Sequence, residues 1–148
     1  MRTLTHFRET RRQAFTMLEL TIVMTIIALA LAIVAPQFNR ARDANSVRSA
    51  VGDLTGAFSL ARQTAVNRRS LTSVVFDTRS ATVIVRSGDD PVIVRQLGTA
   101  YGILLGANRD SAVYDAKGLG YGVTNLTVTV TRGASADTLT LSRLGRVR

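Results

Sequence analysis

The segment 15–35 constrains this chain of 148 residues more than any other. Its 21 residues carry a single charge, on Glu19, and are otherwise dominated by large apolar side chains. As an α-helix rising about 1.5 Å per residue, the segment would span roughly 30 Å, the thickness of a bilayer's hydrocarbon core. A carboxylate inside such a span is costly, and by default it marks a functional site that needs a partner. The segment therefore predicts a membrane-spanning helix in which Glu19 has a role.

The residues before this segment indicate how it would be oriented. Residues 1–14 contain four arginines and one glutamate, so the positive-inside rule keeps the N-terminus cytoplasmic and places residues after Pro36 outside. Two alternatives are an ordinary secretory signal, cut at an Ala-x-Ala site at 28–30 or 30–32, and a plain single-span anchor. An early glutamate is unfavourable in an ordinary signal, and the run is long enough to span a membrane and continues into an amphipathic helix, so the secretory signal is disfavoured.

The composition argues against an enzyme. The chain has no Cys, its one His is His6, and beyond residue 14 its only Glu is Glu19. Such a chain is poorly equipped for acid–base, nucleophilic or zinc chemistry, so we expect no catalytic residues, no metal and no cofactor. The net charge of +9 permits binding to nucleic acid or anionic surfaces without requiring it.

The spacing of apolar residues over 37–69 predicts a second stretch of helix, which is amphipathic. Pro36 is expected to bend or break the helix, because proline removes a backbone donor and clashes one turn back. Beyond it, apolar residues recur at alternating spacings of four and three and form one stripe: Val47, Val51, Leu54, Phe58, Ala61 and Ala65. We expect this stripe to pack on a sheet.

The pattern of residues 70–148 predicts a β-rich globular part of the same domain. Five segments are rich in β-branched residues or alternate with a period of two, and we expect strands over 71–77, 81–86, 92–97, 126–131 and 138–142. A loop is expected over 132–137, and 98–122 has no regular pattern. Asp89 and Asp90 are interpreted as turn residues rather than metal ligands. The prediction is an α+β fold in which a long N-terminal helix packs on an antiparallel sheet.

Residues 14–19, Ala-Phe-Thr-Met-Leu-Glu, resemble the processing site of type IV prepilins. The resemblance implies that a prepilin peptidase cuts after Ala14 and that Phe15, the new N-terminus, is methylated. It also implies that Glu19 pairs with the N-terminal ammonium of a neighbouring subunit and that Pro36 kinks the helix. Ala14 departs from the usual glycine at the cleavage position.

The rest of the chain resembles the GspH/FimT group of minor pilins and pseudopilins. The features that carry this resemblance are an Arg-rich end of the helical arm, an Asp-x-x-Gly segment at 115–118 and a final strand that runs into residues 145–146. The resemblance implies a type IV pilin-like fold and a single pass through the inner membrane with a periplasmic domain. Its implied partners are the peptidase and the other subunits of a type IV pilus or a type II secretion pseudopilus.

The last four residues suggest a second function. Gly145-Arg146-Val147-Arg148 matches an ending that is linked to DNA binding in natural transformation in some FimT-type minor pilins. We expect a flexible tail whose arginines bind phosphates, with Arg143, and Arg132 on the partner strand, as further candidates. The alternative is a solvated strand end, and no aromatic residue interleaves the tail to stack on bases. A structural subunit is the main hypothesis, and DNA binding is the alternative to it.

Overall fold

The computed structural model describes residues 15–122, 125–142 and 145–148. Ala14 and Arg143, which the sequence singled out, lie outside the described residues. The chain divides into two compact units, one ending at Gln37 and the other running from Phe38 to Arg148. Each unit is described by itself.

The first unit consists of the beginning of helix α1, Met17–Arg68. Large apolar side chains are exposed all round this part of the helix: Met17, Leu18, Leu20, Ile22, Val23, Met24, Ile26, Ile27, Leu29, Leu31, Ile33 and Val34. A helix that is apolar on every side suits a membrane or a helical bundle. Among the described residues, α1 is the one helix long and apolar enough to cross a membrane, by length and composition. It continues through Pro36, so the helix does not break there, and the bend expected at Pro36 stays a prediction.

The second part of α1 packs as its apolar stripe predicts. Five of the six stripe residues are buried and Val51 is half-buried. Ala50, Ala57 and Thr64 are buried as well, which widens the stripe.

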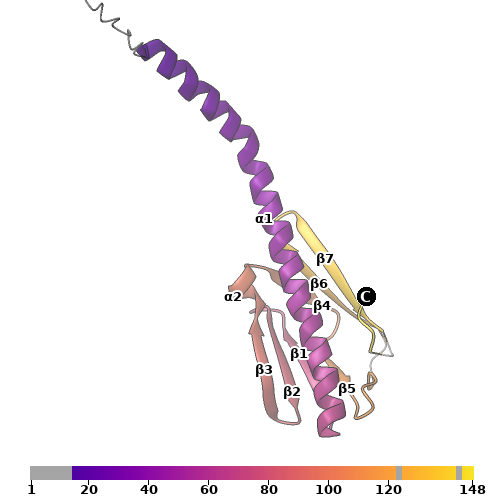
Figure 1. Ribbon diagram of the computed structural model, residues 1–148. Helices are drawn as coiled ribbons and strands as arrows, with labels where there is room; N and C mark the ends of the chain where they lie inside the picture. The colour runs from indigo at the N-terminus through magenta and orange to yellow at the C-terminus, as the bar shows by residue number, and fades with distance from the viewer. Residues whose placement is uncertain (1–14, 123–124, 143–144) are drawn as a thin grey trace, which may run out of the picture. The chain divides into compact units, whose positions relative to one another are not determined.

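Among the described residues of the second unit, seven antiparallel strands form two sheets (Figure 1). The four-stranded sheet has the order β3-β2-β1-β5, with β1 at Thr72–Asp77, β2 at Thr82–Ser87, β3 at Asp90–Gln96 and β5 at Ser111–Tyr114. The three-stranded sheet has the order β4-β6-β7, with β4 at Leu104–Ala107, β6 at Leu126–Arg132 and β7 at Ser135–Leu141. A short helix, α2 (Leu97–Tyr101), connects β3 to β4.

Helix α1 and both sheets share one hydrophobic core. Val74 and Phe76 of β1, and Val128 and Val130 of β6, alternate inward as a period of two requires. Phe58 of α1 meets Phe76 with ring centroids 5.9 Å apart and ring planes inclined at 55°. Tilted aromatic pairs at this separation are favourable. The predicted α+β fold, with the helix on an antiparallel sheet, is thus confirmed, although the strands divide into two sheets.

Two local predictions were wrong. The loop expected over 132–137 is only the two-residue turn Gly133–Ala134, because β6 extends to Arg132 and pairs it with Ser135 of β7. Gly133 has a φ of 54°, which glycine adopts without strain at the first position of such a turn. The segment 98–122, predicted to be irregular, contains β4, β5 and most of α2. Strands of four residues show only two alternations, too few to stand out in the sequence.

Candidate assembly site and candidate nucleic-acid interface

Helix α1 begins with a capping arrangement around Glu19. Thr16 precedes the helix, and its Oγ1 accepts a hydrogen bond of 3.1 Å from the backbone N–H of Glu19. Thr-x-x-Glu is the capping-box spacing, in which the threonine satisfies a helix N–H that would otherwise lack a partner. Glu19 is exposed, and no described side chain binds its carboxylate. The carboxylate is thus available to a partner from another molecule.

The last residues do not form the flexible tail that the sequence predicted. Backbone hydrogen bonds of 2.8 and 2.9 Å pair Arg148 with Thr140, and Ser142 donates to Arg146 O at 2.9 Å. The segment therefore folds back along β7, with a bridge between Leu141 and Val147. Val147 is half-buried against the core, whereas Arg146 and Arg148 on either side of it are exposed. Backbone pairing lowers the entropy that these arginines would lose on binding a ligand.

Gly145 lets this segment turn beside Tyr114. Its φ is 73°, a conformation that residues with a side chain rarely adopt. A Cβ atom at Gly145 would lie 2.9 Å from Cε1 of Tyr114, closer than such atoms approach. The glycine of the Gly-Arg-x-Arg sequence is therefore required by both the backbone conformation and the close approach to this ring.

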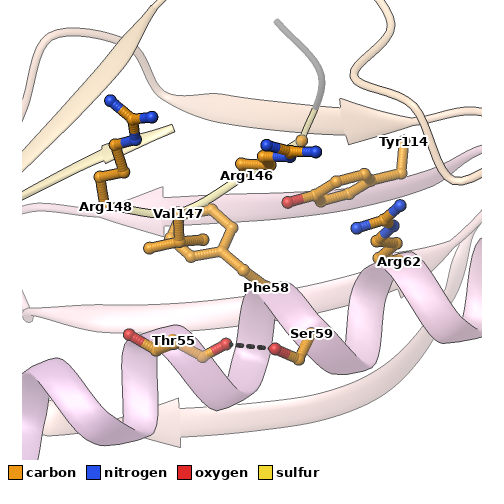
Figure 2. Close-up of a pocket in the computed structure, with 9 residues that line it drawn as sticks. Thr55, Phe58, Ser59, Arg62, Tyr114, Arg146, Val147 and Arg148 are labelled. Carbon is orange, nitrogen blue, oxygen red and sulfur yellow. Dashed lines mark hydrogen bonds between the residues drawn. The ribbon is translucent and has the colours of Figure 1, made fainter. Parts of the chain in front are cut away.

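Arg146, Val147 and Arg148 form one wall of a cavity of about 370 Å³ (Figure 2). The opposite wall comes from helix α1, through Thr55, Phe58, Ser59 and Arg62, and the other lining residues are Tyr114 and Gly145. Arg146 and Arg148 also line a second cavity of about 520 Å³ on the side of Asn125 and Thr127. The two arginines therefore line both cavities.

Arg62 and Tyr114 are among the residues of this cavity that sequence reasoning missed. Arg62 continues the helix face of Thr55 and Ser59, and this periodicity could have indicated it. Tyr114 is 1% exposed, and burial raises its pKa to about 12, with the nearby charge of Arg62 acting in the opposite direction. Tyr114 lies in a short strand that was not predicted, so no local signal could have indicated it.

The Asp-x-x-Gly segment supports the position of Arg62. Asp115 Oδ1 accepts hydrogen bonds of 2.9 Å from the backbone N–H groups of Lys117 and Leu119, which closes a turn. Gly118 in this turn has a φ of 74°. A Cβ atom there would lie 3.2 Å from Cγ and Nε of Arg62 and 3.0 Å from Val66. The glycine leaves room for the Arg62 side chain to pass.

Arg132 does not join the other candidate arginines. It lies at the opposite end of the β6–β7 pair, because the register joins Arg132 to Ser135 and Leu126 to Leu141. Its Nε is 2.9 Å from Oδ1 of Asp43 on α1. Its Nη1 donates to Ser46 Oγ at 2.8 Å and to the carbonyl oxygen of Tyr101. The prediction that Arg132 contributes to a basic tail was wrong, because its guanidinium is bound inside the fold.

The two aspartates that the sequence placed in a turn lie at the turn between β2 and β3. Asp90 is the first residue of β3, and Gly88 and Asp89 form the turn before it. Within the described part of the chain, no group of three or more Asp, Glu, His or Cys residues could hold a metal ion.

Comparison with known families identifies the chain. Residues 50–145 match the family model described as Type II transport protein GspH. The chain belongs to the GspH family. Residues 10–35 also match the prokaryotic N-terminal methylation motif, which fits a membrane-anchored pilin.

Two known proteins resemble this GspH-family chain. The competence protein ComGD of Bacillus subtilis (strain 168) is 28% identical over 106 residues, 72% of either chain. A crystal structure of the type IV minor pilin FimU of Pseudomonas aeruginosa (strain PAO1) matches with a TM-score of 0.61 and 20% identity, over 70% of this chain and 87% of the chain in that structure. A second crystal form of FimU matches with a TM-score of 0.57 and 16% identity, over 68% of this chain and 90% of the chain in that structure. Family and fold together make the chain a type IV pilin-like minor pilin or pseudopilin, a structural subunit rather than an enzyme.

Proposed function

We propose that the protein is a membrane-anchored minor subunit incorporated into a filament through the N-terminal part of α1, with its second unit in the periplasm. The observation that carries this proposal is the N-terminal part of α1, which exposes apolar side chains all round and has one carboxylate, Glu19, that no described residue binds. The bilayer would cover these side chains before assembly, and neighbouring helices would cover them afterwards. The partners are the other pilin subunits of the filament.

Processing would supply the partner for Glu19. Cleavage after Ala14 by a prepilin peptidase leaves the ammonium of Phe15 as the new N-terminus, which is then methylated. A positive charge at a helix N-terminus is disfavoured by the helix dipole. In a bundle of low polarity, the carboxylate of Glu19 on an adjacent helix would stabilise that ammonium, and each group would offset the other's cost of burial. The pairing would also set the axial register between subunits.

The mature N-terminus tests this processing. We expect mass spectrometry of protein from cells with the peptidase to show a chain that begins with N-methylated Phe15. Deleting the peptidase should leave residues 1–14 attached. The variant Ala14→Gly, which restores the usual cleavage residue, should be processed at least as completely. A mature chain that begins after Ala30 or Ala32 would contradict the proposal and indicate an ordinary secretory signal.

We further propose that Arg146 and Arg148 bind the DNA backbone, as part of a type IV pilus that takes up DNA. Their exposure on a paired segment supports this, because guanidinium groups held in place lose little freedom on contacting phosphate oxygens. The relative ComGD is named a competence protein, which agrees with a role in DNA uptake.

Salt-dependent DNA binding tests this second proposal. We expect the full chain in a neutral detergent to bind duplex DNA, with Arg146→Gln and Arg148→Gln each weakening binding about tenfold. Each variant should also lower the slope of log affinity against log salt by about 0.9, because one fewer phosphate is neutralised. Arg48→Gln is the matched control, since Arg48 is exposed on α1 and does not line the cavity. Binding that is absent, or insensitive to salt, would disprove DNA binding.

A further inference from the structure

The hydroxyl of Tyr114 has no hydrogen-bond partner among the described residues, although the side chain is 1% exposed. Figure 2 shows this hydroxyl directed into the cavity between α1 and the last residues of the chain. The other two hydroxyl groups in the cavity donate to helix carbonyls, Thr55 to Val51 at 2.8 Å and Ser59 to Thr55 at 3.0 Å. Tyr114 therefore has the only uncommitted hydroxyl proton among the described residues that line the cavity.

The charged side chains around this hydroxyl are all positive. The nine described lining residues include Arg62, Arg146 and Arg148 and no Asp or Glu, and the α-carboxylate of Arg148 offsets part of this positive charge. Figure 2 shows Arg62, from α1, and Arg146, from the last segment, near the ring of Tyr114. Guanidinium groups and a phenol O–H are all donors, so the cavity offers hydrogen bonds to a ligand that only accepts them. A phosphate diester carries one negative charge and accepts hydrogen bonds without donating any.

We propose that Arg62, Arg146 and the Tyr114 hydroxyl form one site that binds a single phosphate group of the DNA backbone. This inference rests on the proposed DNA binding and extends it from the last residues onto helix α1. A DNA strand held by Arg146 and Arg148 would then follow the cavity toward Arg62.

The surroundings of the site fit this role. Because the pKa of Tyr114 is about 12, its hydroxyl keeps its proton at neutral pH and can donate it to a phosphate oxygen. Two glycines in the left-handed conformation, Gly118 and Gly145, leave the space that Arg62 and the Tyr114 ring occupy. The site is thus built from segments that are distant in sequence, and each is held by its own helix, strand or turn.

Two substitutions separate what the charge of the site contributes to DNA binding from what its hydroxyl contributes. With the full chain in neutral detergent and duplex DNA, we expect Arg62→Gln to weaken binding about tenfold and to lower the salt slope by about 0.9. Tyr114→Phe should weaken binding about threefold without changing the salt slope, since it removes a hydrogen bond but no charge. Its thermal unfolding should match wild type, because no described residue binds the hydroxyl. Arg48→Gln is again the control.

The outcomes distinguish this site from the proposed function. If Arg62→Gln binds DNA as well as Arg48→Gln does, while Arg146→Gln weakens binding, the phosphate site is wrong and DNA binding stands. If wild-type protein does not bind DNA, the proposed DNA binding fails and this site fails with it. If Arg62→Gln leaves DNA affinity unchanged and prevents incorporation into filaments, the cavity is a contact between subunits and the proposal is overturned.

Discussion

Replacing Glu19 with alanine is expected to abolish incorporation of the protein into filaments and to leave its membrane insertion unchanged. Insertion depends on the apolar length of α1, and removing a charge makes that segment more apolar. Assembly would bury the N-terminal ammonium of a neighbouring subunit without a counterion, which is strongly unfavourable in a medium of low polarity. Immunoblots of the membrane fraction and of sheared filaments would measure the two quantities in the same cells.

Thr16→Ala is the matched control for this experiment. It removes the Oγ1 atom that accepts the backbone N–H of Glu19, which costs the helix start about 1 kcal/mol, and it leaves the carboxylate in place. We expect Thr16→Ala to be incorporated into filaments. If both variants lost incorporation into filaments equally, assembly would depend on the structure of the helix start and not on the pairing of Glu19. Normal incorporation of Glu19→Ala would also rule out the pairing.

Arg132→Ala should lower the free energy of unfolding by about 3 kcal/mol. The side chain connects the end of β6 to Asp43 and Ser46 on α1 and to the backbone of Tyr101 at the end of α2. Arg132 and Asp43 are 24% and 26% exposed, so truncating the arginine leaves a largely covered carboxylate without its counterion. Thermal and urea denaturation of the full chain in neutral detergent would measure the loss.

Arg86→Ala serves as the control, since Arg86 is an exposed arginine on β2. Its effect on the free energy of unfolding should stay within about 0.5 kcal/mol, as is usual for surface substitutions. DNA affinity of folded Arg132→Ala should equal that of wild type, because Arg132 is far along the sheet from Arg146 and Arg148. An Arg132→Ala variant as stable as Arg86→Ala would show that the Arg132 contacts contribute little to the free energy of unfolding.

The parts of the fold that could be predicted are those with a long local period. The stripe from Val47 to Ala65 repeats over five helical turns, and β1, β2 and β6 each alternate over six or seven residues. The strands β4 and β5 have four residues each, and their pairing depends on partners elsewhere in the chain. The division into two sheets was not predictable for the same reason, since register is a property of two strands together.

The sequence by itself determined the long apolar segment with its single carboxylate, the amphipathic stripe and the basic ending, because each depends only on neighbouring residues. Only the tertiary structure decided which arginines share a site. Charge alone does not specify a position in space, so the sequence grouped Arg132 with the ending and overlooked Arg62. Folding binds Arg132 to Asp43 at the far end of the sheet and brings Arg62 beside Tyr114, where the last segment turns at Gly145.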